Sequence, residues 1–336
     1  MKNKQTKQPP PRETRSSYKK TRRNIILGAV LLILVLLGLS FRSIVSQYYY
    51  AFILRSDETI SAAMANMDPL YYSTAEQEVL APLERQWDSY KNARLCDRVS
   101  THAKDGVTLT GRLYDNSSET TVVVLHRYDG SSQDDFLYGP YFGDCNLLLP
   151  DARNHGESGG MACTFGALEQ YDLVCWLAWI EESLGKQRVI LYGEDMGAST
   201  ALLASENGLL PDNVAFILAD SPYTSLSDIA DYAMAKWYKI PKCLTHFMGV
   251  MADREDNGFQ VAQADVLSGA KQGSCRVLFL LGEDNEYIPA QQTKALYEAW
   301  GGEKELFSCA SRNGLIYAEH TGEIQRLLDQ WMENDQ

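Results

Sequence analysis

Short apolar runs rich in β-forming residues alternate with helical stretches from residue 96 onward. The runs cover residues 120–125, 145–149, 188–192, 214–219 and 276–281. Helical patterns near 167–184, 196–207, 290–300 and 322–334 separate or follow most of these runs. Buried strands that alternate with helices predict a mostly parallel, doubly wound sheet. Two earlier runs, 97–104 and 107–114, are joined by Lys104-Asp105-Gly106, which predicts an antiparallel hairpin at one edge.

The pattern before residue 96 is different. Ile25 to Phe41 contains no charge and lies between Arg22-Arg23 and Arg42, which predicts a transmembrane helix. The basic residues before it place the N-terminus in the cytoplasm and the rest of the chain outside. A cleavable signal peptide is the alternative, but no small-x-small cleavage site follows cleanly.

These patterns divide the chain into four parts. We expect a basic, disordered cytoplasmic tail at 1–23, a single-pass anchor in the cell membrane at 24–42, a helical stalk at 43–95 and a folded domain at 96–336. A mainly helical insert at about 221–270 interrupts the alternation. Ligands bind at the carboxyl ends of strands in such folds, so we expect this insert to roof a pocket as a cap.

Charge and cysteine content exclude several functions. Residues 1–42 hold ten of the 31 basic residues and one of the 44 acidic residues, so the remainder has a net charge of −22. A surface that acidic excludes nucleic acid as a partner. The seven cysteines have no metal-binding or redox spacing, and we expect no metal and no cofactor. The membrane, through residues 24–42, is the partner that the sequence indicates.

Gly193-Glu194-Asp195-Met196-Gly197 follows a strand and opens a helix. With serine at 195 it would be the G-x-S-x-G nucleophile elbow. Aspartate also tolerates the strained backbone that this turn requires. The chain resembles bacterial membrane-associated α/β-hydrolases near the serine esterases, lipases and S33-type peptidases over about residues 97–335. The motifs that carry the resemblance are at 151–160, 193–198, 220–223 and 282–289.

This resemblance implies the α/β-hydrolase fold and a Ser-Asp-His triad. The three triad positions here are Asp195, Asn285 and Gly314. The oxyanion region, marked by His126, Arg127 and Met196, also departs from the family, whose H-G is His126-Arg127 here. Serine catalysis needs a base and an acid that orients it. We therefore expect a catalytically inactive protein that kept the fold and a pocket for a small-molecule or acyl-chain ligand.

Several alternatives remain open at this stage. Asp195 could act as nucleophile, as in epoxide hydrolases and haloalkane dehalogenases, with His320 as the base. Ser199 could be a relocated nucleophile, although it would lie inside the helix. Asp284 could replace the missing acid, or could join Asp195 and Asn285 in an oxygen site for a hard cation. Because a buried, unpaired carboxylate is unfavourable, we also expect Arg127 to pair with Asp195.

Overall fold

The protein, analysed as a computed structural model, separates into two compact units, Met1–Tyr48 and Tyr49–Gln336. The structure describes residues 15–53, 74–128, 130–132, 136–237, 239, 241–243, 245, 258–312 and 315–333.

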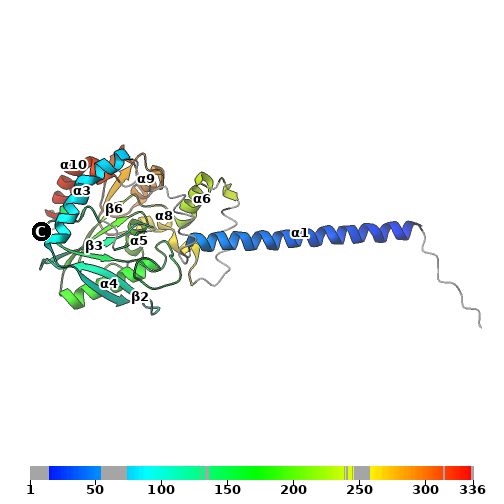
Figure 1. Cartoon of the computed structure of the whole chain (residues 1–336), viewed down its shortest axis with the longest axis horizontal. Coiled ribbons are helices and arrows are strands. Elements are labelled where there is room, and N and C mark those ends of the chain that lie inside the picture. The colour runs from blue at the N-terminus through cyan, green and yellow to red at the C-terminus, as the bar shows by residue number, and fades with distance from the viewer. Residues whose placement is uncertain are drawn as a thin grey trace, which may run out of the picture. The chain divides into compact units, whose positions relative to one another are not determined.

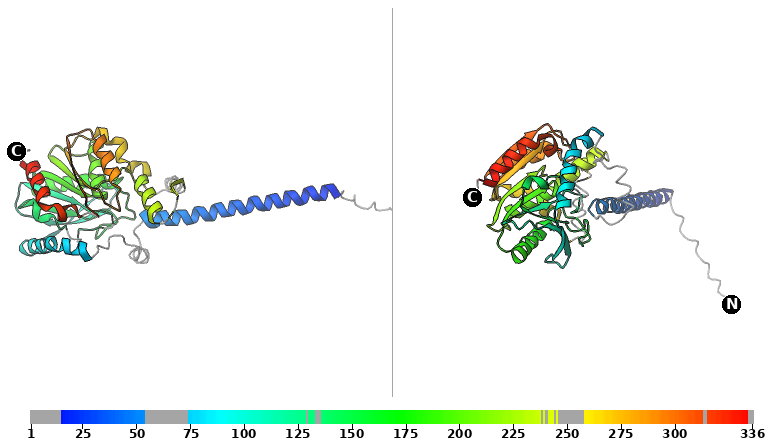
Figure 2. Two further views of the ribbon diagram at one scale, coloured as in Figure 1. Left: turned by 90° about the horizontal axis from the view of Figure 1, so that it is seen from above. Right: turned by 60° about the vertical axis from the view of Figure 1, so that its left-hand side comes forward.

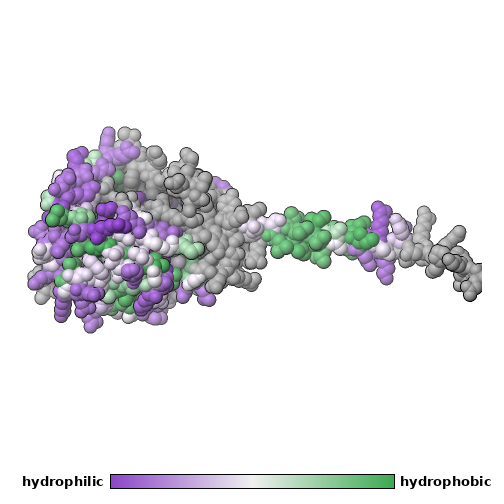
Figure 3. Space-filling model, turned by 60° about the horizontal axis from the view of Figure 1, so that its bottom comes forward, coloured by the Kyte–Doolittle hydropathy of each residue, from purple (hydrophilic) through white to green (hydrophobic). Residues whose placement is uncertain are grey.

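One long helix, α1 (Arg15–Ile53), contains the predicted anchor. Its segment Tyr18–Phe41 is long and apolar enough to cross a membrane, and none of it is buried in the protein. Twenty-four residues at 1.5 Å per residue reach about 36 Å, more than the roughly 30 Å of a bilayer core. Figure 3 shows the apolar band on this helix and the polar residues beside it. Residues 15–23, expected to be disordered, are helical.

The second unit is built on an eight-stranded sheet with the order β1-β2-β4-β3-β5-β6-β7-β8 (Figure 1). The first two strands, β1 (Asp97–His102) and β2 (Thr108–Tyr114), form the predicted hairpin, and β2 is antiparallel to β4. The remaining pairs are parallel. Those strands are β3 (Thr120–Leu125), β4 (Asn146–Pro150), β5 (Arg188–Glu194), β6 (Val214–Asp220), β7 (Val277–Gly282) and β8 (Lys304–Cys309). The fold class predicted from the sequence is confirmed.

Helices cover both faces of the sheet (Figure 2). One face packs against α4 (Glu169–Leu184), α5 (Met196–Glu206), α8 (Val266–Gly269) and α9 (Ala290–Ala299). The other face packs against α3 (Thr74–Ala93) and α10 (Ile316–Glu333), which lie beside each other (Figure 1). Each strand in the middle of the sheet is therefore buried on two sides, which explains its continuous apolar sequence.

Helix α3, assigned from the sequence to a stalk, contributes to the hydrophobic core. The described residues of the connection from β3 to β4 include a short 3-10 helix, η1 (Gly139–Phe142), and α3 packs against it. Trp87 of α3 is 2% exposed, and a Cβ atom on Gly139 would lie 2.4 Å from its ring. Leu80, Leu83 and Tyr90 are buried beside it. The layer next to α10 is thus completed by a helix that precedes the sheet in sequence.

The insert after β6 contains α6 (Leu226–Trp237), η2 (Val261–Ala264), α8 and η3 (Ala270–Gln272), with most of 238–257 outside the described residues. The Tyr232 hydroxyl and the Lys236 ammonium both donate to the Glu286 carbonyl, at 2.9 and 2.7 Å. This part of the insert therefore contacts the loop after β7. Its role as a cap over a pocket stays a prediction.

Candidate functional site

The turn between β5 and α5 has the backbone geometry of a nucleophile elbow. Asp195 lies between the last strand residue and the first helical one, with φ 49° and ψ −104°. A Cβ atom on Gly193 would lie 2.4 Å from the Ala198 nitrogen, and one on Gly197 would lie 2.0 Å from the Leu125 oxygen. Both positions therefore require glycine, and Asp195 takes the strained conformation between them.

Three carboxyl groups meet at the ends of β5 and β6. The Asp195 N–H donates to the Asp220 carbonyl at 2.9 Å, and Glu194 directly precedes Asp195. Burial, followed by the negative charges of Glu194 and Asp220, raises the pKa of Asp195 well above its usual value. Burial and then Glu194 raise the pKa of Asp220 to about 8, against a hydrogen bond from Ser221 that lowers it. The elbow carboxyl is thus held in surroundings that favour its neutral form.

Arg127 does not form the direct pair with Asp195 that we expected. Among the described residues, no salt bridge joins the two side chains. Burial raises the pKa of Glu194, and the positive charge of Arg127 opposes that rise; the same charge acts in the same direction, as the smallest influence, on Asp195. The positive charge of Arg127 therefore favours the ionised forms of both Glu194 and Asp195, and it counts for more at Glu194.

The residue at the acid position is engaged within its own loop. The Asn285 side-chain oxygen accepts hydrogen bonds from the backbone N–H groups of Tyr287 and Ile288, at 2.9 and 3.0 Å. Asp284, the alternative acid, is exposed, and its backbone N–H donates to the Ser311 carbonyl at 3.1 Å. Asn285 therefore shapes the loop before Pro289, a task that requires an oxygen acceptor but no charge.

The position expected for the triad histidine, Gly314, lies outside the described residues. The chain resumes at Leu315, and Tyr317 in the first turn of α10 is fully buried, with its ring 3.8 Å from that of Tyr138. An aromatic stack thus occupies the core where α10 begins.

His320 is paired away from the elbow. Its Nδ1 lies 2.8 Å from the Glu323 carboxylate one turn later, and its ring packs edge-on against Phe307 of β8. The helix is kinked at this residue, with φ −124° and ψ 29°. Among the described residues, no hydrogen bond joins an imidazole to Asp195. The structure therefore does not bring the two members of the alternative mechanism together.

His126 is fixed as a structural residue. The Ala152 N–H donates to its Nε2 at 2.9 Å, so the Nδ1 that lies 2.7 Å from the Arg127 carbonyl carries the proton. Both ring nitrogens are used to hold neighbouring loops. Met196 is 1% exposed, which leaves only its backbone N–H available to an oxyanion. Ser199 is buried and accepts a hydrogen bond from the Tyr223 N–H at 3.0 Å, inside α5 and without access to a substrate.

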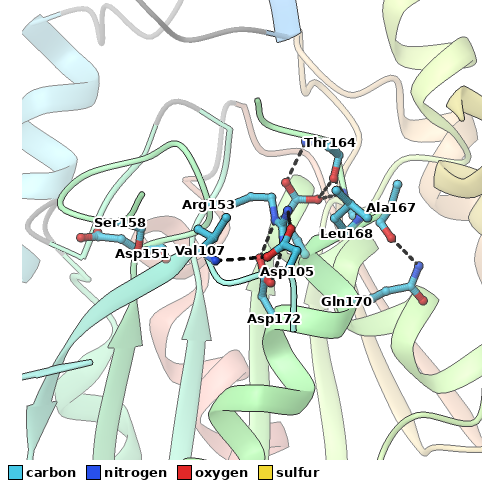
Figure 4. A network of polar contacts seen from close by, with 12 residues as sticks. Asp105, Val107, Asp151, Arg153, Ser158, Thr164, Ala167, Leu168, Gln170 and Asp172 are labelled. Carbon is cyan, nitrogen blue, oxygen red and sulfur yellow. Dashed lines mark hydrogen bonds and ion pairs between the residues drawn. The ribbon is translucent and has the colours of Figure 1, made fainter. Parts of the chain in front are cut away.

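The loop that resembles the family's D-x-R-x-H-G-x-S-x-G motif forms a buried polar network (Figure 4). Arg153 makes two hydrogen bonds to the Asp172 carboxylate, at 2.6 and 2.7 Å, and a third to Asp105 at 2.9 Å. Asp151 accepts from the backbone N–H groups of Ser132 and Glu157, at 2.5 and 2.8 Å. These bonds tie the loop after β4 to α4 and to the hairpin, and they position the segment that follows β3.

A cavity of about 280 Å³ lies beside the elbow, on the side of the oxyanion loop. Its lining includes Leu80 and Glu84 from α3, Arg127, Phe136, and Tyr192 and Glu194 at the end of strand β5. None of its lining residues comes from the described part of the insert. Sequence reasoning missed α3 as a wall of this cavity. The amphipathic pattern of 76–95 indicated a helix with one buried face, but not the surface against which that face packs.

The described residues contain no group of three or more His, Cys, Asp or Glu side chains that could hold a metal ion. The oxygen site considered for Asp195, Asp284 and Asn285 is not assembled, because Asn285 binds its own loop and Asp284 is exposed. All seven cysteines are free thiols.

Comparison with known proteins supports the same architecture. The model of the α/β hydrolase fold family matches residues 121–242. An uncharacterized protein of Bacillus subtilis, YqkD, is 24% identical over 223 residues, which cover 65% of this chain and 73% of that protein.

Solved esterases have a similar structure at low sequence identity. The Pyrococcus furiosus esterase Pf2001 has a TM-score of 0.59 and 21% identity, over 72% of this chain and 93% of that one. An acetyl xylan esterase from Paenibacillus sp. R4 has a TM-score of 0.52 and 14% identity, over 78% and 96% of the two chains. Together with the strand order and the elbow, these matches identify the chain as a protein of the α/β-hydrolase fold.

Proposed function

We propose that this protein is an extracytoplasmic, membrane-anchored member of the α/β-hydrolase fold that binds a ligand and does not turn it over. The observation that carries the proposal is the environment of Asp195. Burial, and after it the charges of Glu194 and Asp220, raise its pKa and disfavour its ionised form, and no described imidazole is bonded to it. A carboxylate nucleophile needs its negative charge to attack, and a base to activate the water that releases the ester intermediate. Neither requirement is supported here.

The second candidate is a hydrolase that uses Asp195 as nucleophile and His320 as base. Asp195 at an intact elbow favours it, because elbow aspartate is a nucleophile in part of this fold class. The pairing of His320 with Glu323 opposes it. The first interpretation is the better supported of the two.

Turnover assays separate these two candidates. The full chain in detergent would be tested on p-nitrophenyl acetate, p-nitrophenyl butyrate and styrene oxide, with Asp195→Ala and His320→Ala in parallel. We expect the same rate for all three proteins, equal to the rate without protein. Turnover by the parent that both substitutions abolish would replace the proposal with the second candidate.

The anchor and its orientation are supported by the apolar segment of α1 and by the basic residues before it. Cys96 and Cys243 are exposed in the second unit and can report the topology. On intact cells, a membrane-impermeant maleimide is expected to label the parent protein and not the Cys96→Ser, Cys243→Ser double variant. A cysteine introduced by Gln5→Cys into that double variant should react only after permeabilisation. The opposite pattern would reverse the orientation.

A further inference from the structure

The cavity beside the elbow has an excess of negative charge. Among the described residues, its lining contains two carboxylates, Glu84 from α3 and Glu194 from β5, and one guanidinium, Arg127. His126 also lines it, in the neutral form that its two hydrogen bonds impose. With both carboxylates ionised, a single positive charge on a ligand would balance the lining. The net charge of −22 beyond residue 42 also attracts cations toward this domain.

Aromatic rings form one wall of the same cavity. Phe136, Tyr138 and Tyr192 all line it, and the ring of Tyr192 lies 5.1 Å from Phe136 and 6.1 Å from Tyr138. Rings of this kind attract organic cations that approach their faces, and the attraction grows when water is excluded. All three residues are buried.

The hydroxyl of Tyr192 has no hydrogen-bond partner among the described residues, although the residue is only 1% exposed. A buried hydroxyl without a partner is unfavourable, so its presence in a cavity lining calls for an acceptor. The volume of about 280 Å³ corresponds to roughly nine water molecules at 30 Å³ each. It lies near the lower end of the range for small-molecule sites.

We propose that this cavity binds a small organic ammonium ion that carries a hydroxyl group. The ammonium group lies between the carboxylates of Glu84 and Glu194, against the aromatic wall, and the ligand hydroxyl accepts a hydrogen bond from Tyr192. This inference deepens the proposed function, since it names the class of ligand that a non-catalytic pocket would hold. A carboxylate ligand on Arg127 would instead face two acidic side chains in the same cavity.

Binding to the full chain in detergent, measured by titration calorimetry at pH 8, tests the proposal. The probes are choline, its uncharged isostere 3,3-dimethylbutan-1-ol, and butyrate. We expect choline to bind at least about tenfold more tightly than the isostere, because only choline has the charge. Butyrate should not bind. Equal binding of choline and the isostere, stronger binding of butyrate, or no binding of choline up to millimolar concentration would overturn the proposal.

Variants locate the bound cation. Glu194→Gln is expected to weaken choline binding about tenfold and Tyr192→Phe about three- to tenfold, through lost charge and a lost hydrogen bond. Glu84→Gln, at the exposed mouth of the cavity, should weaken it two- to threefold without a change in folding.

The matched controls are Glu78→Gln and Tyr317→Phe. Glu78 is exposed on the same helix as Glu84, Tyr317 is buried with an unpartnered hydroxyl like Tyr192, and neither lines the cavity. Both controls should bind choline as the parent does. Choline affinity that is unchanged in Glu84→Gln and Glu194→Gln, with parental unfolding midpoints, would contradict the assignment of the cavity.

The binding experiment and the turnover experiment test separate claims, and one claim can be wrong while the other holds. Turnover that depends on Asp195 and His320 would remove the non-catalytic proposal, whatever the affinity for choline. Absence of choline binding in a protein without turnover would remove the ligand class and leave the non-catalytic proposal intact.

Discussion

The nucleophile elbow and the loop after β7 each have an ordered backbone, but their central side chains, Asp195 and Asn285, are engaged in different ways. At the elbow, the backbone keeps the geometry of a working hydrolase, with Asp195 at φ 49° between two glycines that no other residue could replace. After β7, the backbone loop is also kept, but Asn285 now holds the loop itself together. Packing constrains the backbone of a site independently of its chemistry, so the geometry of an elbow does not by itself establish catalysis.

A substitution that disrupts the backbone of the elbow should have the largest effect on the stability of the protein. Gly197→Ala places a Cβ atom 2.0 Å from the Leu125 oxygen, a contact that only a shift of β3 or α5 could relieve. We expect a loss of about 3 kcal/mol or more in the free energy of unfolding. Chemical denaturation in detergent checks this. Gly322→Ala in α10, where a Cβ atom meets nothing within 4 Å, should instead stabilise the protein by about 0.5–1 kcal/mol.

The carboxyl cluster under the elbow should make stability depend on pH. The pKa of Asp220 is about 8 in the folded protein against 3.8 for an ordinary aspartate, so its contribution is fully present below pH 3.8. That contribution is lost as pH rises through 8. Asp220→Asn removes the titration and should stabilise the protein by about 1–3 kcal/mol at pH 8, and by less at pH 5. A gain that is equal at both pH values would contradict this account. Asp284→Asn, at an exposed position, is the control and should shift stability by less than about 0.5 kcal/mol.

At the acid position, the structural role of Asn285 can be separated from a catalytic one. Asn285→Ala removes the acceptor of two backbone N–H groups and should cost about 1–2 kcal/mol of stability. Asn285→Asp keeps an oxygen acceptor, so we expect a change below about 0.5 kcal/mol and no gain in ester hydrolysis. An increase in turnover on p-nitrophenyl acetate by Asn285→Asp would mean that a histidine still faces this loop.

His320 should matter least to both stability and chemistry. Its partner Glu323 is exposed and the pair lies on the surface of α10, so His320→Ala should change the free energy of unfolding by less than about 1 kcal/mol. Glu323→Ala is the matched variant and should have an effect of the same size. A loss several times larger for His320→Ala alone would indicate a role that the Glu323 pair does not explain.

The sequence predicted the mostly parallel sheet with its edge hairpin, and the elbow, because these depend on local patterns. Alternation of buried runs with helices is typical of a doubly wound sheet. The spacing of Gly193 and Gly197 indicates a tight turn in which a side chain at either position would clash with the backbone. The position of α3 could not be predicted, since an amphipathic helix indicates that one face is buried and not against what. The directions of individual side chains could not be predicted from the sequence either. Tyr192 lies in a predicted strand that gives no sign of a cavity, and neither the kink of α10 at His320 nor the contact of His320 with Glu323 was predicted.

The direct Arg127–Asp195 pair was predicted from the unfavourable burial of one carboxylate. The structure instead surrounds that carboxylate with two more, and the charge of Arg127 acts mainly on Glu194. A single sequence does not reveal that β5 and β6 end side by side with Glu194 and Asp220 in register. Burial, and after it this proximity, raises the pKa of the elbow carboxyl and favours its neutral form.

Isotope incorporation at Asp195 tests the central claim most directly. The full chain would be incubated with styrene oxide and, separately, p-nitrophenyl butyrate in water enriched in oxygen-18, digested, and analysed by mass spectrometry of the peptide that contains Asp195. With styrene oxide, an aspartate nucleophile opens the ring and forms an ester; with p-nitrophenyl butyrate it expels p-nitrophenolate and forms a mixed anhydride. Attack of water at the aspartyl carboxyl carbon of either intermediate leaves an oxygen atom from water in the Asp195 carboxylate. We predict no incorporation above that of an incubation without substrate. Incorporation of oxygen-18 into Asp195 that requires substrate would contradict the account and establish Asp195 as a working nucleophile.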